Sequence, residues 1–144
     1  MDMKTMALAA IKAGMAPIPI RAGGKVPLDR WTDDQHHPMD ETEIPRRFRN
    51  GCNLGIVCGA GSGNLECLDF DNASLFQPLL DTLEAVNPGL RQKLTVWQET
   101  PSGGYHLLYR CSAPVGGNTV LARDQGGKAA IETRGQGGQF LIAP

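Results

Sequence analysis

No hydrophobic run in the 144-residue sequence approaches the roughly 20 apolar residues that a membrane-spanning helix needs. A net excess of charge is missing as well, because 14 Lys and Arg residues stand against 15 Asp and Glu residues. That balance excludes a strongly basic nucleic-acid wrapper and an acidic, solvating tail. The N-terminal segment has no signal-peptide cleavage pattern, so we expect a cytoplasmic protein with no membrane partner.

The four cysteines include no pair with CxxC spacing, so the usual arrangement of zinc ligands is missing. Cys58 and Cys67 sit in apolar, strand-like runs. We expect both to be buried as small hydrophobic side chains with free thiols. A cytosolic setting also disfavours disulfides.

Glycine and proline are abundant by contrast, with 18 and 10 residues, and their scattered positions predict tight turns between short elements. An Ala-, Met- and Leu-rich pattern predicts a helix over residues 3–13, which Gly14 would end. A second, short helix is predicted with Thr42 as its cap and Gly51 as its end.

Apolar residues at helical intervals predict a third helix up to residue 86, where Ser74 and Gln77 have the spacing of a capping box. Strands are predicted at residues 17–20, 53–58, 65–71, 94–99, 105–110, 129–133 and 139–142. The two prolines of residues 17–20 predict an edge strand, because proline cannot donate a ladder hydrogen bond. A few helices with many short strands predict an α+β fold with a largely antiparallel sheet.

Two acidic residues, Asp69 and Asp71, end the strand predicted at residues 65–71. Side chains alternate along a strand, so both carboxylates share one face and stand about 7 Å apart. Two like charges this close favour a cation between them, and carboxylate pairs are good ligands for Mg²⁺ or Mn²⁺. A strand that runs into a polar turn would produce the same residues, and the motif alone leaves both interpretations open.

A second candidate segment contains Ser102, Gly103, Gly104 and His106. A Gly-Gly loop lets backbone N–H groups approach an anion, and the serine adds a hydroxyl donor. His106 begins the next strand, where it can donate to a phosphate oxygen or transfer a proton. A hairpin turn followed by a half-buried histidine would explain the same residues.

The third segment places Glu132 and Arg134 on one face of a strand that leads into a glycine-rich turn. A guanidinium beside open backbone suits phosphate binding. The alternative is a surface Glu–Arg pair of little energetic consequence. The order of the three segments would bring a metal pair, a phosphate site and a third carboxylate to three strands of one sheet.

In this order the sequence resembles the bifunctional DNA primase/polymerase N-terminal (prim-pol) domain of the archaeo-eukaryotic primase superfamily. The resemblance covers residues 13–144. Its three motifs correspond to residues 68–71, 101–106 and 131–138, with flanking similarity at residues 24–27, Trp31 and residues 53–59. Glu132 is one departure, since many members carry Asp at this position.

The resemblance implies one catalytic domain over residues 1–144. An RRM-like, largely antiparallel sheet (about residues 61–144) would carry the active site and pack against a small N-terminal α/β unit (about residues 1–60). Residues 140–144 match a strand that family members continue beyond, so we expect the chain to lack the last part of the domain.

The resemblance also implies template-directed nucleotidyl transfer from nucleotide triphosphates, in replication of a plasmid, phage or mobile element. It implies Mg²⁺ or Mn²⁺ as cofactor, and a single-stranded DNA template and a helicase as partners. The implied catalytic residues are Asp69, Asp71, His106 and Glu132, of which the three carboxylates bind metal, and the implied nucleotide-binding residues are Lys25, Ser102, Gly103, Gly104, His106 and Arg134. Trp31 is either a core anchor or a platform for base stacking.

Two alternative functions would require other sequence features. A non-catalytic nucleic-acid- or nucleotide-binding module on the same fold would show exposed aromatics on the sheet, where this sequence has acids and a histidine. A rolling-circle nuclease needs a His-hydrophobic-His pair, whereas His36 and His37 are adjacent. The sequence leaves open primase against polymerase activity and ribonucleotides against deoxyribonucleotides.

Overall fold

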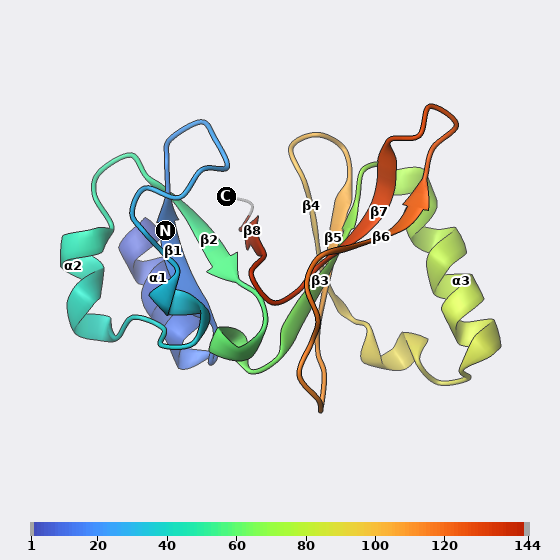
Figure 1. Cartoon of the computed structure of the whole chain (residues 1–144), viewed down its shortest axis with the longest axis horizontal. Coiled ribbons are helices and arrows are strands. Elements are labelled where there is room, and N and C mark those ends of the chain that lie inside the picture. The colour runs from blue at the N-terminus through green and yellow to red at the C-terminus, as the bar shows by residue number, and fades with distance from the viewer. Residues whose placement is uncertain (1, 143–144) are drawn as a thin grey trace.

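The computed structural model describes residues 2–142, which form three α-helices and eight strands (Figure 1). The elements are α1 (Met3–Lys12), β1 (Ala16–Ile20), α2 (Ile44–Arg47), β2 (Asn53–Val57), β3 (Leu65–Phe70), α3 (Phe76–Val86), β4 (Val96–Glu99), β5 (Tyr105–Arg110), β6 (Thr119–Arg123), β7 (Ala129–Arg134) and β8 (Gln139–Leu141). Short 3-10 turns join several of them.

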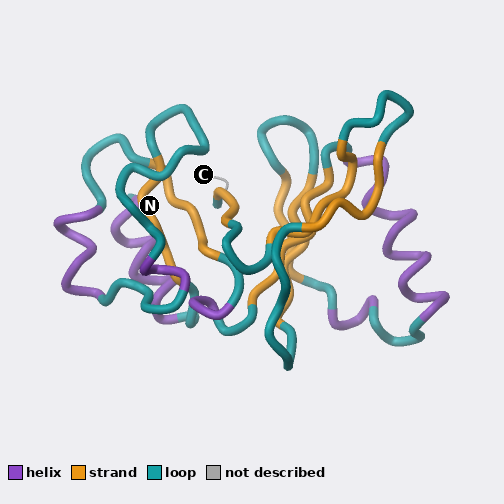
Figure 2. Tube along the Cα trace, in the orientation of Figure 1, coloured by secondary structure: helices purple, strands orange, loops and turns teal. Residues whose placement is uncertain are grey.

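The strands form two antiparallel sheets (Figure 2). The small sheet has the order β1-β2-β8, and the large sheet has the order β4-β5-β3-β7-β6. The α+β class and the antiparallel pairing predicted from the sequence are therefore confirmed. The strands that carry the three motifs, β3, β5 and β7, lie side by side in the large sheet.

The small sheet, with α1 and α2, forms the N-terminal unit. β1 is an edge strand, as its prolines predicted, and α1 lies on one face of the sheet with Ala7 and Ala10 buried against it. The side chain of Asp2 caps α1 by accepting a hydrogen bond from the Thr5 amide, 3.0 Å away. Trp31 packs against the apolar cluster on the other face, which is the role of a core anchor.

One face of the large sheet is covered by α3, whose Leu80 packs against apolar side chains of the sheet. These side chains are Leu68, Phe70, Leu107 and Ile131. Because side chains alternate along a strand, the other face carries Asp69, His106 and Glu132 and is turned toward the N-terminal unit. The fold thereby separates an apolar face from a polar one.

β8 connects the two units. It follows β7 in the chain, yet it pairs with β2 in the small sheet instead of forming a hairpin with β7. A shared apolar cluster lies beneath this crossover, and Cys58 and Cys67 are both part of it. Their predicted burial is confirmed, and it raises the pKa of the Cys58 thiol to about 12 and that of Cys67 further.

Three local predictions need correction. Asp40, and not Thr42, caps the segment before α2, because its side chain accepts from the Thr42 amide and Glu43 completes a capping box. α2 ends at Arg47, well before Gly51, and Arg47 makes two hydrogen bonds of 2.7 and 2.9 Å to Asp34.

At the start of α3 the capping side chain is Asn72, which accepts from the Ser74 amide at 2.9 Å, so Ser74 is not the cap. β6 was not predicted as a strand. Its exposed residues lack the alternation that marks a half-buried strand, and pairing with β7 alone defines it.

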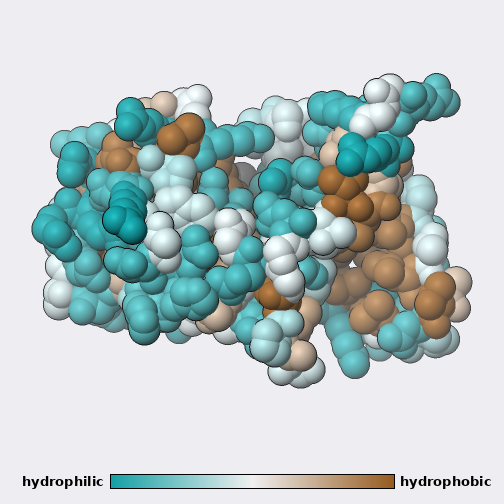
Figure 3. Space-filling view, in the orientation of Figure 1, coloured by the Kyte–Doolittle hydropathy of each residue, from teal (hydrophilic) through white to brown (hydrophobic). Residues whose placement is uncertain are grey.

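In residues 2–142 no helix is long and apolar enough to cross a membrane. On the face drawn in Figure 3, apolar residues gather on the α3 side of the large sheet, while the N-terminal unit is mostly hydrophilic.

Candidate active site

A row of four polar side chains crosses the large sheet from β4 to β7. The strand register pairs Gln98 with His106, His106 with Asp69, and Asp69 with Glu132. Directly paired residues in antiparallel strands point to the same face, so the four side chains stand next to one another. Sequence motifs predicted the last three members of this row, whereas Gln98 belongs to no motif and only the strand register reveals it.

Arg134 joins the two carboxylates of the row. Its Nη2 atom lies 3.0 Å from Asp69 Oδ2 and 3.1 Å from Glu132 Oε2. Glu132 and Arg134 share one face of the strand, as predicted. They form more than a surface ion pair, because Arg134 also bonds the partly buried Asp69.

The pKa of Asp69 reflects two opposing effects. Burial raises this pKa, but the interactions with His106 and Arg134 outweigh burial, and the pKa falls below its usual value. Asp69 is therefore an ionised carboxylate at neutral pH, hydrogen bonded to Arg134 and close to His106.

His106 is nearly buried, and its ring packs edge-on against Phe140 of β8, with centroids 5.6 Å apart. Its Nε2 atom lies 3.6 Å from Asp69 Oδ1, longer than a hydrogen bond. Its Nδ1 atom lies 2.8 Å from Gln98 Nε2. The ring is thus fixed on one edge and directed toward the acidic pair on the other.

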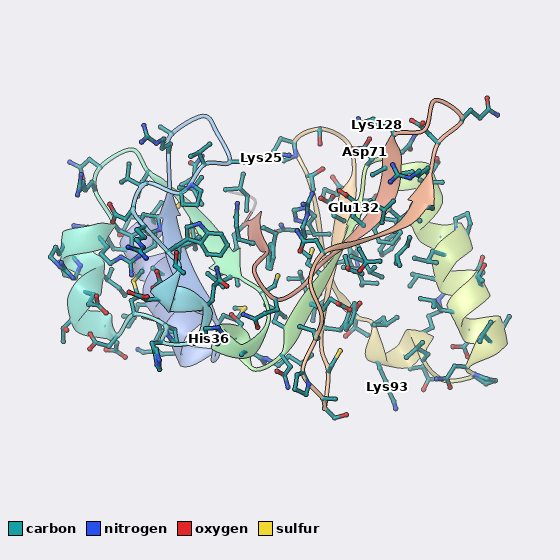
Figure 4. All side chains as sticks on the ribbon, viewed as in Figure 1. Lys25, His36, Asp71, Lys93, Lys128 and Glu132 are labelled. Carbon is teal, nitrogen blue, oxygen red and sulfur yellow. The ribbon has the colours of Figure 1, made fainter. Side chains whose placement is uncertain are left out.

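Asp71 lies just beyond the end of β3 and is paired with Lys128, whose Nζ atom is 2.8 Å from its Oδ2 atom (Figure 4). The hydrogen bond to Asp71 raises the pKa of Lys128. Both side chains are at least half exposed, so this contact is easily exchanged for another partner. Lys128 was not predicted, since nothing in its local sequence distinguishes it from an exposed turn lysine.

These side chains line a cavity of about 740 Å³ between the two units. Its wall includes Asp69, Asp71, His106, Glu132, Arg134 and Lys128 from the large sheet and its loops, together with Gln98, Ser102, Lys25, Gln139 and Phe140. Lys25 extends from the N-terminal unit toward the side of the large sheet (Figure 4). The cavity has a size typical of small-molecule sites.

The Gly-Gly loop does not present its amides as the sequence suggested. The Gly103 amide donates to the carbonyl of Thr100 at 2.9 Å, and the Gly104 amide donates to Thr100 Oγ1 at 3.0 Å. Gly103 has a φ of +86°, and a Cβ on Gly104 would lie 1.9 Å from the Phe70 carbonyl oxygen. The positive φ favours glycine at position 103 and close packing requires it at position 104, while phosphate binding by their amides stays a prediction.

The predicted metal ligands are only partly assembled. Among residues 2–142, no group of three or more His, Cys, Asp or Glu side chains lies close enough together to hold a metal ion. Asp69 and Glu132 are neighbours, and Asp71 lines the same cavity but is paired with Lys128. Three carboxylates on one wall still supply the hard oxygen donors that Mg²⁺ and Mn²⁺ prefer. In this structure Arg134 and Lys128 balance the negative charge of these carboxylates.

A family model for the N-terminal domain of bifunctional DNA primase/polymerases matches residues 7–144. Among curated proteins, none matches the sequence.

Proposed function

Because the chain belongs to the family of bifunctional DNA primase/polymerase N-terminal domains, we propose that it catalyses template-directed, metal-dependent nucleotidyl transfer from nucleotide triphosphates. One observation carries the proposal beyond family membership. The acidic pair Asp69 and Glu132, the histidine His106 and the cation Arg134 share one wall of a nucleotide-sized cavity.

Phosphoryl transfer depends mainly on positioning and on stabilisation of charge. The cavity supplies cations from both units, since Lys25 comes from the N-terminal unit and Lys128 and Arg134 come from the large sheet. We assign these three residues, together with the hydroxyl of Ser102, to the triphosphate. A triphosphate that binds between them would hold the two units together.

Asp69, Asp71 and Glu132 would hold the divalent cation. When bound, Mg²⁺ or Mn²⁺ lowers the pKa of the attacking hydroxyl and neutralises charge on the triphosphate. Asp69 is already ionised at neutral pH, so it needs no proton release before it can bind a cation. Asp71 exchanges its exposed contact with Lys128, which leaves the lysine free to bind a phosphate oxygen.

His106 contributes through its Nε2 edge, which faces the cavity and lies beyond hydrogen-bond distance of Asp69. An N–H group at that position can donate a hydrogen bond to a triphosphate oxygen. This hydrogen bond strengthens as negative charge develops on that oxygen. Burial of the ring against Phe140 fixes its orientation, which limits the reorganisation needed during the reaction.

Residues 1–144 would act as one catalytic domain, with an N-terminal part up to about residue 60, whose sheet β8 completes, and an RRM-like part in the rest of the chain. In support of that comparison, β3, α3 and β4 form a split β-α-β unit in which β5 lies between the two strands. A single-stranded DNA template and a helicase are the proposed partners, and the proposed setting is replication of a plasmid, phage or mobile element.

Primer extension by the purified chain tests the function, with Mn²⁺, a primed single-stranded template and each set of nucleotide triphosphates. Asp69→Ala and Asp71→Ala are each expected to reduce incorporation about 100-fold or more. Asp81→Ala, at an exposed aspartate of α3 paired with Arg91, is the matched control and should retain activity. Equal extension by all four proteins would contradict the proposal, and nucleotide binding without incorporation would favour a non-catalytic binding module.

A further inference from the structure

Gln98 of β4 stands between the histidine of the candidate site and the strand that crosses to the small sheet. Its side-chain Nε2 atom lies 2.8 Å from His106 Nδ1 and 2.6 Å from the backbone carbonyl oxygen of Leu141 in β8. Gln98 is half-buried, and it also lines the cavity. No motif of the sequence singles it out.

The two contacts determine which atoms carry hydrogen. A backbone carbonyl oxygen can only accept, so the Gln98 atom that faces Leu141 must be the amide nitrogen. That nitrogen carries two hydrogens, and the second is directed at His106 Nδ1. Nδ1 must then accept, and in the neutral ring the proton is on Nε2.

We propose that Gln98 is a positioning residue that fixes His106 in the tautomer protonated at Nε2. This tautomer turns an N–H donor toward Asp69 Oδ1, 3.6 Å away, and toward the cavity. The opposite tautomer would direct a lone pair at a carboxylate and could offer no donor to a phosphate oxygen. The benefit to nucleotidyl transfer rests on the proposed function, whereas the tautomer itself does not.

The same amide links the two units. One hydrogen of Gln98 Nε2 is bonded to β8, which pairs with β2 of the small sheet, and the other is bonded to His106 of the large sheet. A shift of β8 away from β4 would therefore remove the hydrogen bond to Leu141, which orients the Gln98 amide toward the histidine ring. The donor of the candidate site is thereby tied to the packing of the two sheets.

Nitrogen NMR of the chain labelled with ¹⁵N-histidine measures the tautomer directly, without any polymerisation assay. The sequence has three histidines, and His36→Gln and His37→Gln assign the two exposed ones. In the neutral ring, which the same spectrum identifies, we expect His106 to show a protonated Nε2 and an unprotonated Nδ1. A protonated Nδ1 in the wild-type chain would overturn the proposal by itself.

Gln98→Glu provides the matching perturbation. A carboxylate can only accept, so it should place a proton on Nδ1, which carries none in the proposed wild-type tautomer. Gln92→Glu, at an exposed residue between α3 and β4, makes the same chemical change and should leave His106 unaltered. A Gln98→Glu chain in which Nδ1 stays unprotonated would contradict the assignment, and if this variant does not fold, the wild-type spectrum still decides.

Primer extension with the same variants separates this inference from the proposed function. Gln98→Glu is expected to lower kcat/KM for the nucleotide about 10-fold to 100-fold, as is common when a partner that orients a histidine is lost, whereas Gln92→Glu is not. Full activity with a protonated Nδ1 would overturn the positioning role. The predicted tautomer in a wild-type chain that incorporates no nucleotide would instead refute the proposed function and leave the assignment of Gln98 intact.

Discussion

Asp69 and Glu132 face each other across β3 and β7, and one nitrogen of Arg134 lies 3.0 Å from the first carboxylate and 3.1 Å from the second. Opposed like charges in neighbouring strands destabilise a sheet unless a cation neutralises them. The Arg134 guanidinium neutralises the two carboxylates in this structure. We infer that it also keeps the acidic pair in position before a divalent cation binds.

Arg134→Ala should therefore destabilise the chain by about 1 to 2 kcal/mol, because it leaves two partly buried carboxylates unbalanced. Urea unfolding measures the change, and added Mn²⁺ should restore part of it by binding the folded state. Arg91→Ala removes an exposed ion pair to Asp81 and is the control, with an expected change below about 0.5 kcal/mol. Equal losses in the two variants would contradict the role given to Arg134.

The acid sensitivity of folding should depend on Asp69. Its pKa in the folded chain lies below the unfolded value of about 3.9, so its contribution to stability is present above that pH. The contribution is lost as the pH falls through the lower, folded-state pKa. The difference in unfolding free energy between the wild-type chain and Asp69→Asn should therefore be larger at pH 6 than at pH 2.5, whereas a difference independent of pH would contradict the cited shift.

Lys128 competes with a cation for Asp71. Lys128→Ala should tighten Mn²⁺ binding to the chain up to about fivefold, since an exposed ion pair of this kind is worth at most about 1 kcal/mol. Titration calorimetry with Mn²⁺ alone gives the affinity. Lys93→Ala removes an exposed lysine far from Asp71 (Figure 4) and should not alter it. Weaker binding by Lys128→Ala would show that the lysine does not compete with the cation.

The two glycines of the β4–β5 loop should differ in their tolerance of alanine. Gly104→Ala places a methyl group 1.9 Å from the Phe70 carbonyl oxygen and should destabilise the chain by about 2 kcal/mol or more. Gly103→Ala meets no atom within 4 Å and incurs only the strain of a positive φ, about 1 kcal/mol. Thermal unfolding of both variants checks the order, and a larger loss in Gly103→Ala would contradict it.

The sequence was sufficient to predict the three motif strands and the shared face of Glu132 and Arg134, because alternation along a strand is a local property. It was not sufficient for Gln98 or Lys128. Their place in the site depends on the register of β4 and on the loop before β7, which only the folded sheet determines.

Local sequence patterns also could not predict that β8 pairs with β2. The short connection after β7 is compatible with a hairpin, but β8 crosses to the small sheet, where Phe140 is buried in the apolar cluster that contains Cys58 and Cys67. The hydrogen bonds made by the Gly103 and Gly104 amides, which were predicted to bind phosphate, could not be predicted for a related reason. A Gly-Gly pair signals unusual backbone conformation, but only the structure shows that Thr100 accepts both amides.

The most direct test of the metal site is a crystal soaked with Mn²⁺ and a nucleotide triphosphate, in which anomalous scattering locates manganese. We predict a peak bound by oxygens of Asp69, Asp71 and Glu132, with Lys128 released from Asp71 and the triphosphate beside His106. A bound nucleotide with manganese away from all three carboxylates would contradict the account.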